Sequence, residues 1–313
     1  MTYVILDLEW NAAFSKKYRK YVNEIIEFGA VKVSDEGTSG ILEIIDTFSM
    51  LVTPQIGKRL NADVQALTRI TIEELTKSKN MFSHVLSKFI KFLGDSTLMT
   101  WGTGDILVLI DNYKYYYRND ILPFFNRYCN LQVYCQKCLN LNDPAKQLGL
   151  LNCAEILKIS QNGKPLHRAL TDASLSFQCF EKLFDPEFAL AETEQVTSEF
   201  YTKLLFKSVY ICNIKSPLID QSQMRFTCNI CGTMSIQITH WRLKNRSFIA
   251  DFYCPSCDIE FQGRITLKLK YTGLTVSKKL SEKPKTHEDE DIQREKERRK
   301  DNGKKLDVKE NIE

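Results

Sequence analysis

The stretch Tyr3-Val4-Ile5-Leu6-Asp7-Leu8-Glu9 decides the fold of this chain. Its apolar run predicts a buried strand. Asp7 and Glu9 end the strand two positions apart, and because strand side chains alternate between faces, both carboxylates point to the same side. Acidic residues are disfavoured inside strands, so the pair favours cation binding. Taken alone, the pair has an alternative explanation, which is a solvated strand end.

The rest of the first half predicts further strands and helices around this strand. Apolar runs predict strands over 24–33, 41–52, 97–101 and 131–134. Apolar residues at three- and four-residue spacing, together with sequence breaks, predict helices over 61–75, 81–93, 105–117, 141–150, 168–184 and 187–206. Strands followed by alternating helices and strands predict an α/β fold, with a mixed sheet covered by helices on both faces.

Composition limits the class of protein. The chain has 313 residues, 43% hydrophobic and 26% charged, so we expect about two globular domains and no bulk disorder. A net charge of +4 permits a polyanionic partner without requiring one. No signal-length or membrane-length apolar run is found, so we expect a cytoplasmic protein with no membrane partner.

Three further residues extend the acidic pair. Asp105 follows the predicted strand at 97–101 and the sequence Gly102-Thr103-Gly104, at a sheet rim where α/β proteins bind ligands; capping of a helix is its alternative role. His167 and Asp172 are five positions apart, or about 140° around a helix. Both reach one site if His167 lies in the loop or first turn before the helix that carries Asp172, and the loop over 162–165 allows this. A structural histidine is the alternative for His167 alone.

This ordered set resembles the DEDDh branch of the DnaQ-like (proofreading exonuclease) superfamily. Asp7-Leu8-Glu9 matches its Asp-x-Glu motif, Asp105 matches its second acid, and His167 with Asp172 matches its His-x4-Asp motif. The tyrosine branch would place tyrosine at Arg168. The stretches over 48–54, 67–71 and 100–102 also resemble the subgroup that includes the sporulation inhibitor KapD and the histone-mRNA 3′-end exonuclease. The resemblance covers roughly residues 1–184.

The resemblance implies a ribonuclease H-like fold and a two-metal 3′-to-5′ exonuclease. Asp7, Glu9, Asp105 and Asp172 would hold two Mg²⁺ or Mn²⁺ ions, for which hard oxygen ligands are suited. His167 would act as the general base, since imidazole titrates near neutral pH. Trp10 stands where many members carry a small residue or Thr that helps to seat the terminal nucleotide, so we assign it to nucleic-acid binding.

Four of the ten cysteines predict a second module. Cys228-x2-Cys231 and Cys254-x2-Cys257 are two tight pairs separated by 22 residues, a spacing typical of a structural zinc ribbon with one Zn²⁺. Between the pairs lies a basic and aromatic strip, which predicts contact with phosphates and bases, although a solvated hairpin is an equal alternative. The strip comprises Trp241, Arg242, Lys244 and Arg246.

The predicted domains are an exonuclease domain over 1–184, a helical linker over 185–223, a β-rich zinc ribbon over 224–272 and a charged disordered tail over 273–313. We expect the substrate to be the 3′ end of single-stranded nucleic acid, with RNA favoured over DNA. A protein partner of the ribbon or tail is an alternative role for that region. The alternative functions are a DNA proofreading or repair exonuclease and a non-catalytic nucleic-acid-binding regulator.

Overall fold

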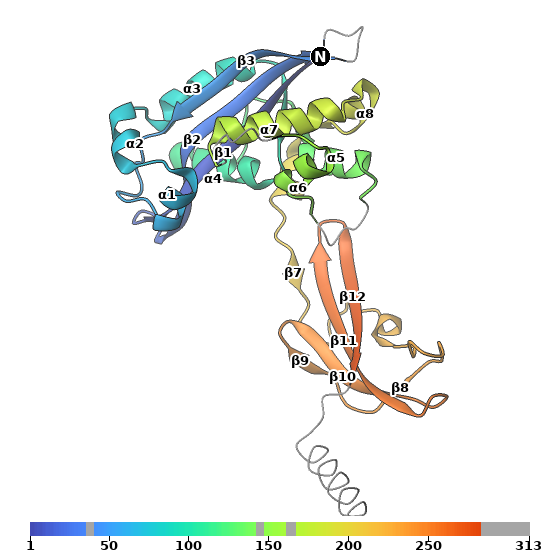
Figure 1. Cartoon of the computed structure of the whole chain (residues 1–313). Helices are drawn as coiled ribbons and strands as arrows, with labels where there is room; N and C mark the ends of the chain where they lie inside the picture. Colours follow the sequence, from blue (N-terminus) through green and yellow to red (C-terminus); the bar gives the residue numbers. More distant parts are fainter. Residues whose placement is uncertain (36–40, 142–146, 161–166, 283–313) are drawn as a thin grey trace, which may run out of the picture. The chain divides into compact units, whose positions relative to one another are not determined.

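The structure is a computed structural model that describes residues 1–35, 41–141, 147–160 and 167–282. The chain divides into two compact units, the first ending at Leu205 and the second beginning at Phe206 (Figure 1). The loop over 162–165 and the part of the predicted tail over 283–313 lie outside the described residues.

A six-stranded mixed sheet forms the centre of the first unit, in the order β3-β2-β1-β4-β5-β6. The strands are β1 (Thr2–Ser15), β2 (Lys20–Asp35), β3 (Leu42–Leu51), β4 (Thr97–Thr100), β5 (Arg127–Asn130) and β6 (Glu194–Gln195). β1 pairs antiparallel with β2 and parallel with β4, and β4 pairs parallel with β5. The outer pairs β2–β3 and β5–β6 are antiparallel. The predicted mixed α/β sheet is therefore confirmed.

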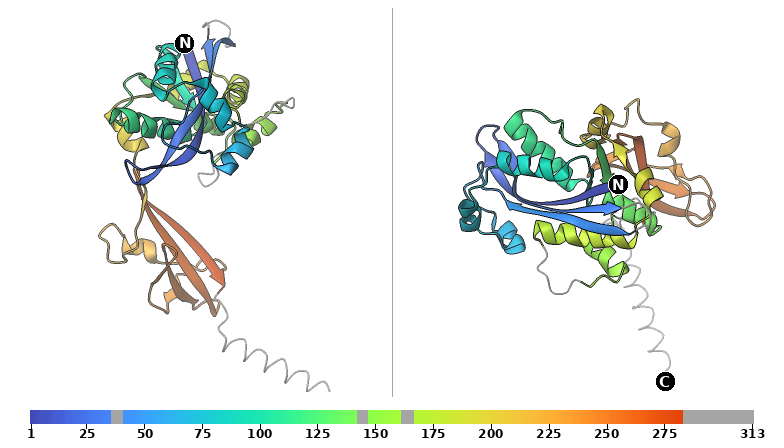
Figure 2. Two further views of the ribbon diagram at one scale, coloured as in Figure 1. Left: turned by 90° about the vertical axis from the view of Figure 1, so that its left-hand side faces the viewer. Right: turned by 90° about the horizontal axis from the view of Figure 1, so that it is seen from above.

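Helices cover both faces of this sheet, as the right-hand view of Figure 2 shows. They are α1 (Ala62–Thr68), α2 (Ile72–Ser78), α3 (Phe82–Leu93), α4 (Gly104–Tyr117), α5 (Leu131–Cys138), α6 (Leu150–Ile156), α7 (Ala169–Lys182), α8 (Pro186–Ala191) and α9 (Ser198–Leu204). Leu6 and Leu8 of β1 pack with α3 and α4, whereas Ile5 packs with α5, α6 and α7. Because side chains alternate along a strand, Asp7 and Glu9 end on the α7 side.

The start of α7 lies directly on β2. A Cβ atom at Gly29 would be 2.0 Å from the carbonyl carbon of Ala169 and 2.0 Å from the nitrogen of Leu170. Only glycine permits this approach of two backbones. The first turn of α7 is thereby held against the sheet beside β1.

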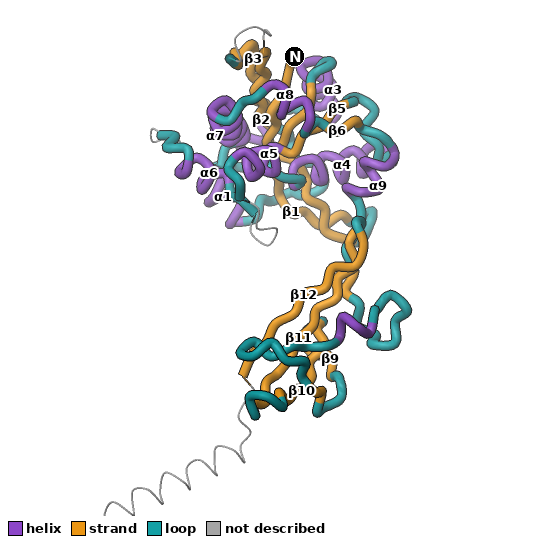
Figure 3. The backbone as a smooth tube through the Cα atoms, turned by 90° about the vertical axis from the view of Figure 1, so that its right-hand side faces the viewer, coloured by secondary structure: helices purple, strands orange, loops and turns teal. Residues whose placement is uncertain are grey.

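The second unit is β-rich, as the strand colouring of Figure 3 shows. Its strands are β7 (Val209–Tyr210), β8 (Ile236–Gln237), β9 (Arg242–Lys244), β10 (Ser247–Cys254), β11 (Ile259–Lys270) and β12 (Gly273–Glu282). The 3₁₀ helix η1 (Gln221–Met224) lies between β7 and β8 in the chain. β10 pairs with β8, β9 and β11, and β11 also pairs with β7 and β12. Phe226, Phe252 and Phe261 pack in its core.

Four local predictions were wrong. Within the range 141–150, where we expected a helix, the described residues 147–149 are not helical and α6 begins at Leu150. The helix expected over 61–75 is two helices, because Arg69 adopts a left-handed conformation and Thr71 caps the second one. The strand expected over 131–134 belongs to helix α5, where the Asn130 side chain accepts a hydrogen bond from the Val133 N–H and starts the helix. The helix expected over 187–206 is interrupted by β6.

The predicted domain boundaries also need correction. The first unit continues past residue 184 because Ala189 and Phe200 pack on opposite faces of its sheet. Residues 273–282, which we expected in the tail, form β12 and pair with β11 along its length. Leu274 and Val276 lie on one face of this strand and pack against the core of the second unit. Within the described ranges, no helix combines the length and apolar character needed to cross a membrane.

Candidate active site and metal centres

Three of the predicted ligands meet in the first unit. Asp7, Glu9 and Asp172 each offer a carboxylate oxygen within 4.8 Å of the others. The first two come from β1, and Asp172 comes from the first turn of α7. Residues distant in the sequence thus bring together oxygen atoms of the kind that hard divalent cations prefer.

Asp105 lies beside this group and is buried. It is on the first turn of α4, two residues beyond the N-cap Thr103, so its alternative role as the N-cap is wrong. Its Oδ1 instead accepts a hydrogen bond of 3.0 Å from the backbone N–H of Leu8, the residue between Asp7 and Glu9. Asp105 is outside the 4.8 Å group but is fixed to the strand that supplies two of its members.

The turn before Asp105 is held by a buried hydrogen-bond network. The Thr100 hydroxyl lies 2.6 Å from the carbonyl oxygen of Gly102 and 2.8 Å from the Tyr128 hydroxyl. The Tyr128 hydroxyl also donates to the Gly102 carbonyl, at 2.9 Å. Gly102 has a positive φ of 79°, which suits glycine. The network fixes the direction in which α4 leaves β4, and so the place of Asp105.

Burial and mutual repulsion disfavour negative charge on these acids. Burial, followed by the Asp172 carboxylate, raises the pKa of Glu9 from 4.5 to about 8. Burial raises the pKa of Asp105 to about 7, and burial with the Asp105 charge raises the pKa of Asp7 well above its ordinary value. The pKa of Asp172 is also raised by burial. A bound cation would offset both effects, so this donor set fits divalent metal ions.

His167 lies immediately before α7, in the position that the His-x4-Asp spacing requires. Its backbone is left-handed, with φ of 66°, and its N–H donates to Oδ2 of Asp172 at 3.1 Å. The backbone of His167 therefore lies one short turn from Asp172, a predicted metal ligand. Left-handed non-glycine residues are uncommon and concentrate at functional sites.

Sequence reasoning missed Glu27, a buried carboxylate on β2 opposite Glu9. Its oxygens accept hydrogen bonds from Nε of Arg168 at 3.1 Å and from Nη2 at 2.7 Å. Glu27 also accepts the N–H of Ala169 at 3.1 Å, at a helix start where Arg168 provides no side-chain cap. Glu27 thus ties α7 to β2 and accepts an N–H of the first turn that has no partner within the helix. Its signal in the sequence was an acid inside the apolar run over 25–28.

The four paired cysteines meet in the second unit. The Sγ atoms of Cys228, Cys231, Cys254 and Cys257 all lie within 4.8 Å of one another. Cys231 is 3.5 Å from Cys254, and Cys228 is 4.0 Å from Cys257. Sulfurs around a tetrahedral zinc ion are separated by about 3.8 Å, given Zn–S bonds of about 2.3 Å. These separations are also too long for a disulfide.

The two cysteine pairs adopt the same turn. Gly232 donates its N–H to the carbonyl of Cys228 at 2.9 Å, and Asp258 donates to Cys254 at 3.0 Å. Both donors have positive φ, 73° for Gly232 and 56° for Asp258. The β-rich unit with this cluster matches the predicted zinc ribbon.

The predicted nucleic-acid-binding residues have different environments. Trp10 is half-buried and packs at the edge of the first core. Trp241 packs against Phe226 and Phe252 in the ribbon, with ring centroids 6.5 and 5.7 Å away. The remaining three are exposed: Arg242 lies 3.7 Å from Asp251, Arg246 lies over the Tyr210 ring, and Lys244 is on β9. Their role in binding remains a prediction.

We predict that Glu27→Gln lowers the free energy of unfolding by about 2 kcal/mol, because Arg168 loses a charged partner while remaining half-buried. Urea denaturation of the zinc-loaded protein at pH 7, with no Mg²⁺ or Mn²⁺ added, measures this. Glu74→Gln is the matched control: Glu74 is 4.0 Å from Arg168 and 42% exposed, so its loss should cost under about 0.5 kcal/mol. Equal stability of the two variants would contradict the assigned role of Glu27.

Known proteins resemble the first unit in sequence and fold. The family model RNase_T, described as exonuclease, matches residues 4–180. No curated protein matches the chain. Among solved structures, a full-length 3′-exonuclease is 24% identical, covering 63% of this chain and 67% of its own, with a TM-score of 0.50. A 3′-exonuclease in 3′-end specific recognition of histone mRNA stem-loop is 23% identical, covering 63% and 91%, also with a TM-score of 0.50.

Both solved structures share the fold of the first unit, and the family model spans more than half of the chain. The acids and the histidine that the motifs predicted lie within or beside one carboxylate group of that unit. The chain therefore belongs to the RNase_T family of exonucleases.

Proposed function

We propose that this protein removes nucleotides from the 3′ end of single-stranded nucleic acid, with RNA as the preferred polymer. The observation that carries the proposal is the convergence of Asp7, Glu9 and Asp172, with Asp105 fixed beside them. Acids whose pKa values are raised by burial and by each other form a site that calls for cations. Phosphodiester hydrolysis is a reaction that uses such a site.

Each residue has a proposed role in hydrolysis. Asp7 would contact both of two Mg²⁺ or Mn²⁺ ions, Glu9 and Asp172 would complete one ion site, and Asp105 would hold the second ion. Ions held by these acids would supply the positive charge that stabilises the attacking and leaving oxygens. His167 would accept the proton of the attacking water, and the bond from its backbone N–H to Asp172 fixes the turn that carries the imidazole. Glu27 and Arg168 hold this turn against β2.

RNA is preferred for two reasons. The stretches over 48–54, 67–71 and 100–102 resemble the subgroup that includes the histone-mRNA 3′-end exonuclease. One solved structure with the same fold is that of a 3′-exonuclease recognising a histone mRNA stem-loop. DNA proofreading or repair is the alternative within the same chemistry, and parallel digestion of end-labelled RNA and DNA distinguishes them.

The carboxylates and the histidine should respond differently to substitution. We predict that Asp7→Asn lowers kcat by at least about a thousandfold, because the site loses cation affinity. His167→Ala should lower kcat by about 10²–10⁴-fold and leave Mn²⁺ affinity unchanged. Release of mononucleotides from end-labelled RNA measures the rate, and calorimetry measures Mn²⁺ binding.

Asp46→Asn is the matched control for the loss of a carboxylate, because Asp46 is exposed on β3. It should retain full activity. Full activity of purified Asp7→Asn would instead show that these acids are not the catalytic centre, and would favour a non-catalytic nucleic-acid-binding protein.

We also propose that the cysteine cluster holds one structural Zn²⁺. Four thiolates complete a tetrahedral shell and leave no open position for catalysis. Zinc binding by such sites is coupled to folding, with apparent free energies of about 10–16 kcal/mol. The ion would therefore stabilise the second unit and take no part in hydrolysis.

Loss of this ion should unfold the ribbon selectively. We predict that Cys254→Ser removes zinc and makes residues 206–282 susceptible to protease, because the remaining apolar core is small. Cys212→Ser is the control, since Cys212 is an exposed cysteine of the same unit outside the cluster. Elemental analysis and limited proteolysis measure both outcomes. A zinc-free Cys254→Ser protein with an intact second unit would contradict the structural role.

A further inference from the structure

The turn that joins β1 to β2 concentrates basic and aromatic side chains. It reads Lys16-Lys17-Tyr18-Arg19-Lys20-Tyr21, and all six residues are exposed. Tyr21 pairs across the strands with Phe14, yet their side chains remain 72% and 50% exposed. A cross-strand aromatic pair can stabilise a hairpin. It does not explain why four cations accompany rings that face solvent.

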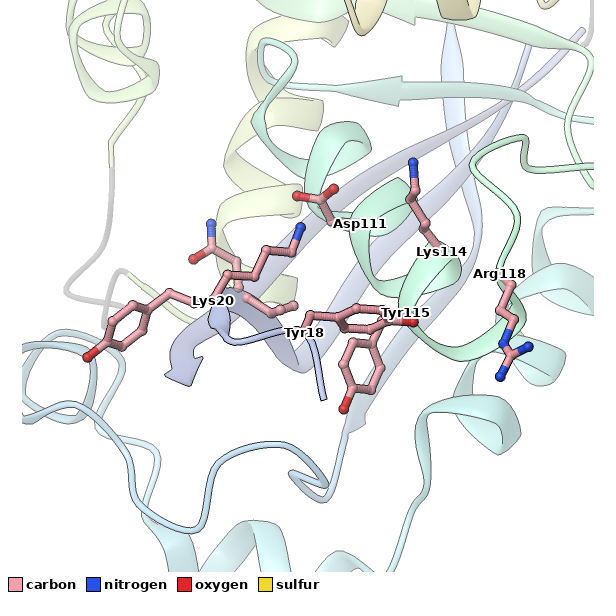
Figure 4. Close-up of a pocket in the computed structure, with 9 residues that line it drawn as sticks. Tyr18, Lys20, Asp111, Lys114, Tyr115 and Arg118 are labelled. Atoms are coloured by element: carbon pink, nitrogen blue, oxygen red, sulfur yellow. The ribbon is translucent and has the colours of Figure 1, made fainter. Parts of the chain in front are cut away.

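A hollow of about 320 Å³ lies between this turn and the C-terminal half of α4 (Figure 4). Its lining includes Tyr18, Lys20 and Tyr21 from the hairpin and Asp111, Tyr115 and Arg118 from α4 and its end. We call this hollow and the turn over 16–21 the hairpin-tip surface. Its side chains combine rings that can stack on a base with cations that can meet a phosphate.

Six basic residues but one acid, Asp111, belong to this surface, so its positive charge is mostly unneutralised. Lys114 lies 2.8 Å from Asp120, and the pKa of Lys114 is raised by that hydrogen bond. Among the described residues, Lys20 and Arg118 form no ion pair with a carboxylate. Lys17 Nζ lies 5.0 Å from the Tyr18 ring centroid and 5.3 Å from that of Tyr115, so this cation lies over both rings. The surface is therefore positive and suited to a polyanion.

Asn112 of α4, which is fully buried, ties the helix beneath the hairpin-tip surface to β2. Its Nδ2 donates to the carbonyl of Asn23 at 2.7 Å, and its Oδ1 accepts the N–H of Ile25 at 3.2 Å. Asn112 thus ties the middle of α4 to β2. Since Asp105 starts α4 and β2 pairs with β1, the surface and the carboxylates belong to one packed framework.

The distance between the start of α4 and the hairpin-tip surface suits a nucleic-acid strand that extends from the active site. From Gly104 to Tyr115 the helix rises about 17 Å, at about 1.5 Å per residue. A stacked strand advances about 3.4 Å per nucleotide, so this span corresponds to about five nucleotides. A trinucleotide in the active site would not reach the hairpin-tip surface, whereas a dodecamer would.

We propose that the hairpin-tip surface binds single-stranded nucleic acid upstream of the 3′ end that is being removed. The inference rests on the proposed function, because the 3′ end must occupy the carboxylate site. Exposed rings favour unpaired bases, whose faces are free to stack, over a duplex. Lys20 and Arg118 contact phosphates, and Tyr18 and Tyr21 contact bases.

The test compares substrate lengths in the double variant Lys20→Gln/Arg118→Asn; asparagine suits the positive φ of Arg118. We expect KM for a single-stranded dodecamer to rise about tenfold at 0.1 M salt, with kcat/KM for a trinucleotide unchanged. Binding of a labelled dodecamer, followed by fluorescence anisotropy, should show a salt dependence that is shallower by about 1.4 in log–log slope, since two phosphate contacts are lost.

Lys88→Gln/Lys91→Gln removes the same charge from exposed positions on α3 and should change neither quantity. Unchanged dodecamer affinity in the Lys20 and Arg118 variant overturns the inference. An equal loss of kcat/KM on the dodecamer and the trinucleotide also overturns it, as does a greater loss on a substrate that is base-paired upstream. If the unmodified enzyme cuts neither substrate, the proposed function fails. The anisotropy measurement still decides whether the surface binds the strand.

Discussion

Repulsion among partly buried carboxylates is the constraint on which the first unit depends. Asp7, Glu9 and Asp172 lie within 4.8 Å of one another, and Asp105 is bonded to the backbone between the first two. No favourable contact among these acids holds them together when they are charged. Their positions come from the buried strand β1, from the packing of α7 on Gly29, and from the network that fixes the turn before α4. A cation would offset the repulsion that this packing imposes.

The start of α7 is the place where several of these constraints meet. Glu27 caps the helix and binds Arg168, while Gly29 allows its backbone to touch β2. The left-handed backbone of His167 then lets its N–H reach Asp172. The His-x4-Asp spacing therefore spans the short turn at His167 and the first turn of α7. Glu27 of β2 holds the start of that helix in place.

The sequence predicted the features that depend on local patterns. Alternation along β1 placed Asp7 and Glu9 on one face, and the tight cysteine spacing predicted the cluster of the second unit. Features set by tertiary contacts were not predicted. Glu27 owes its role to Arg168, which is far away in the sequence, and β12 forms because β11 offers it an edge. The break at Arg69 was missed because a non-glycine left-handed residue leaves no clear pattern.

If these acids form a cation site, divalent ions should displace protons from them on binding. Without metal, the raised pKa values of Glu9, about 8, of Asp105, about 7, and of Asp7, well above its ordinary value, favour bound protons at this site near pH 7. Calorimetric titration of the zinc-loaded protein with Mn²⁺, in two buffers of different ionisation enthalpy, measures this release. Mn²⁺ binding should release at least one proton per chain, and Asp7→Asn should show neither the binding nor the release. Absence of Mn²⁺ binding, or binding with no proton release, would contradict the assignment of these acids as a cation site.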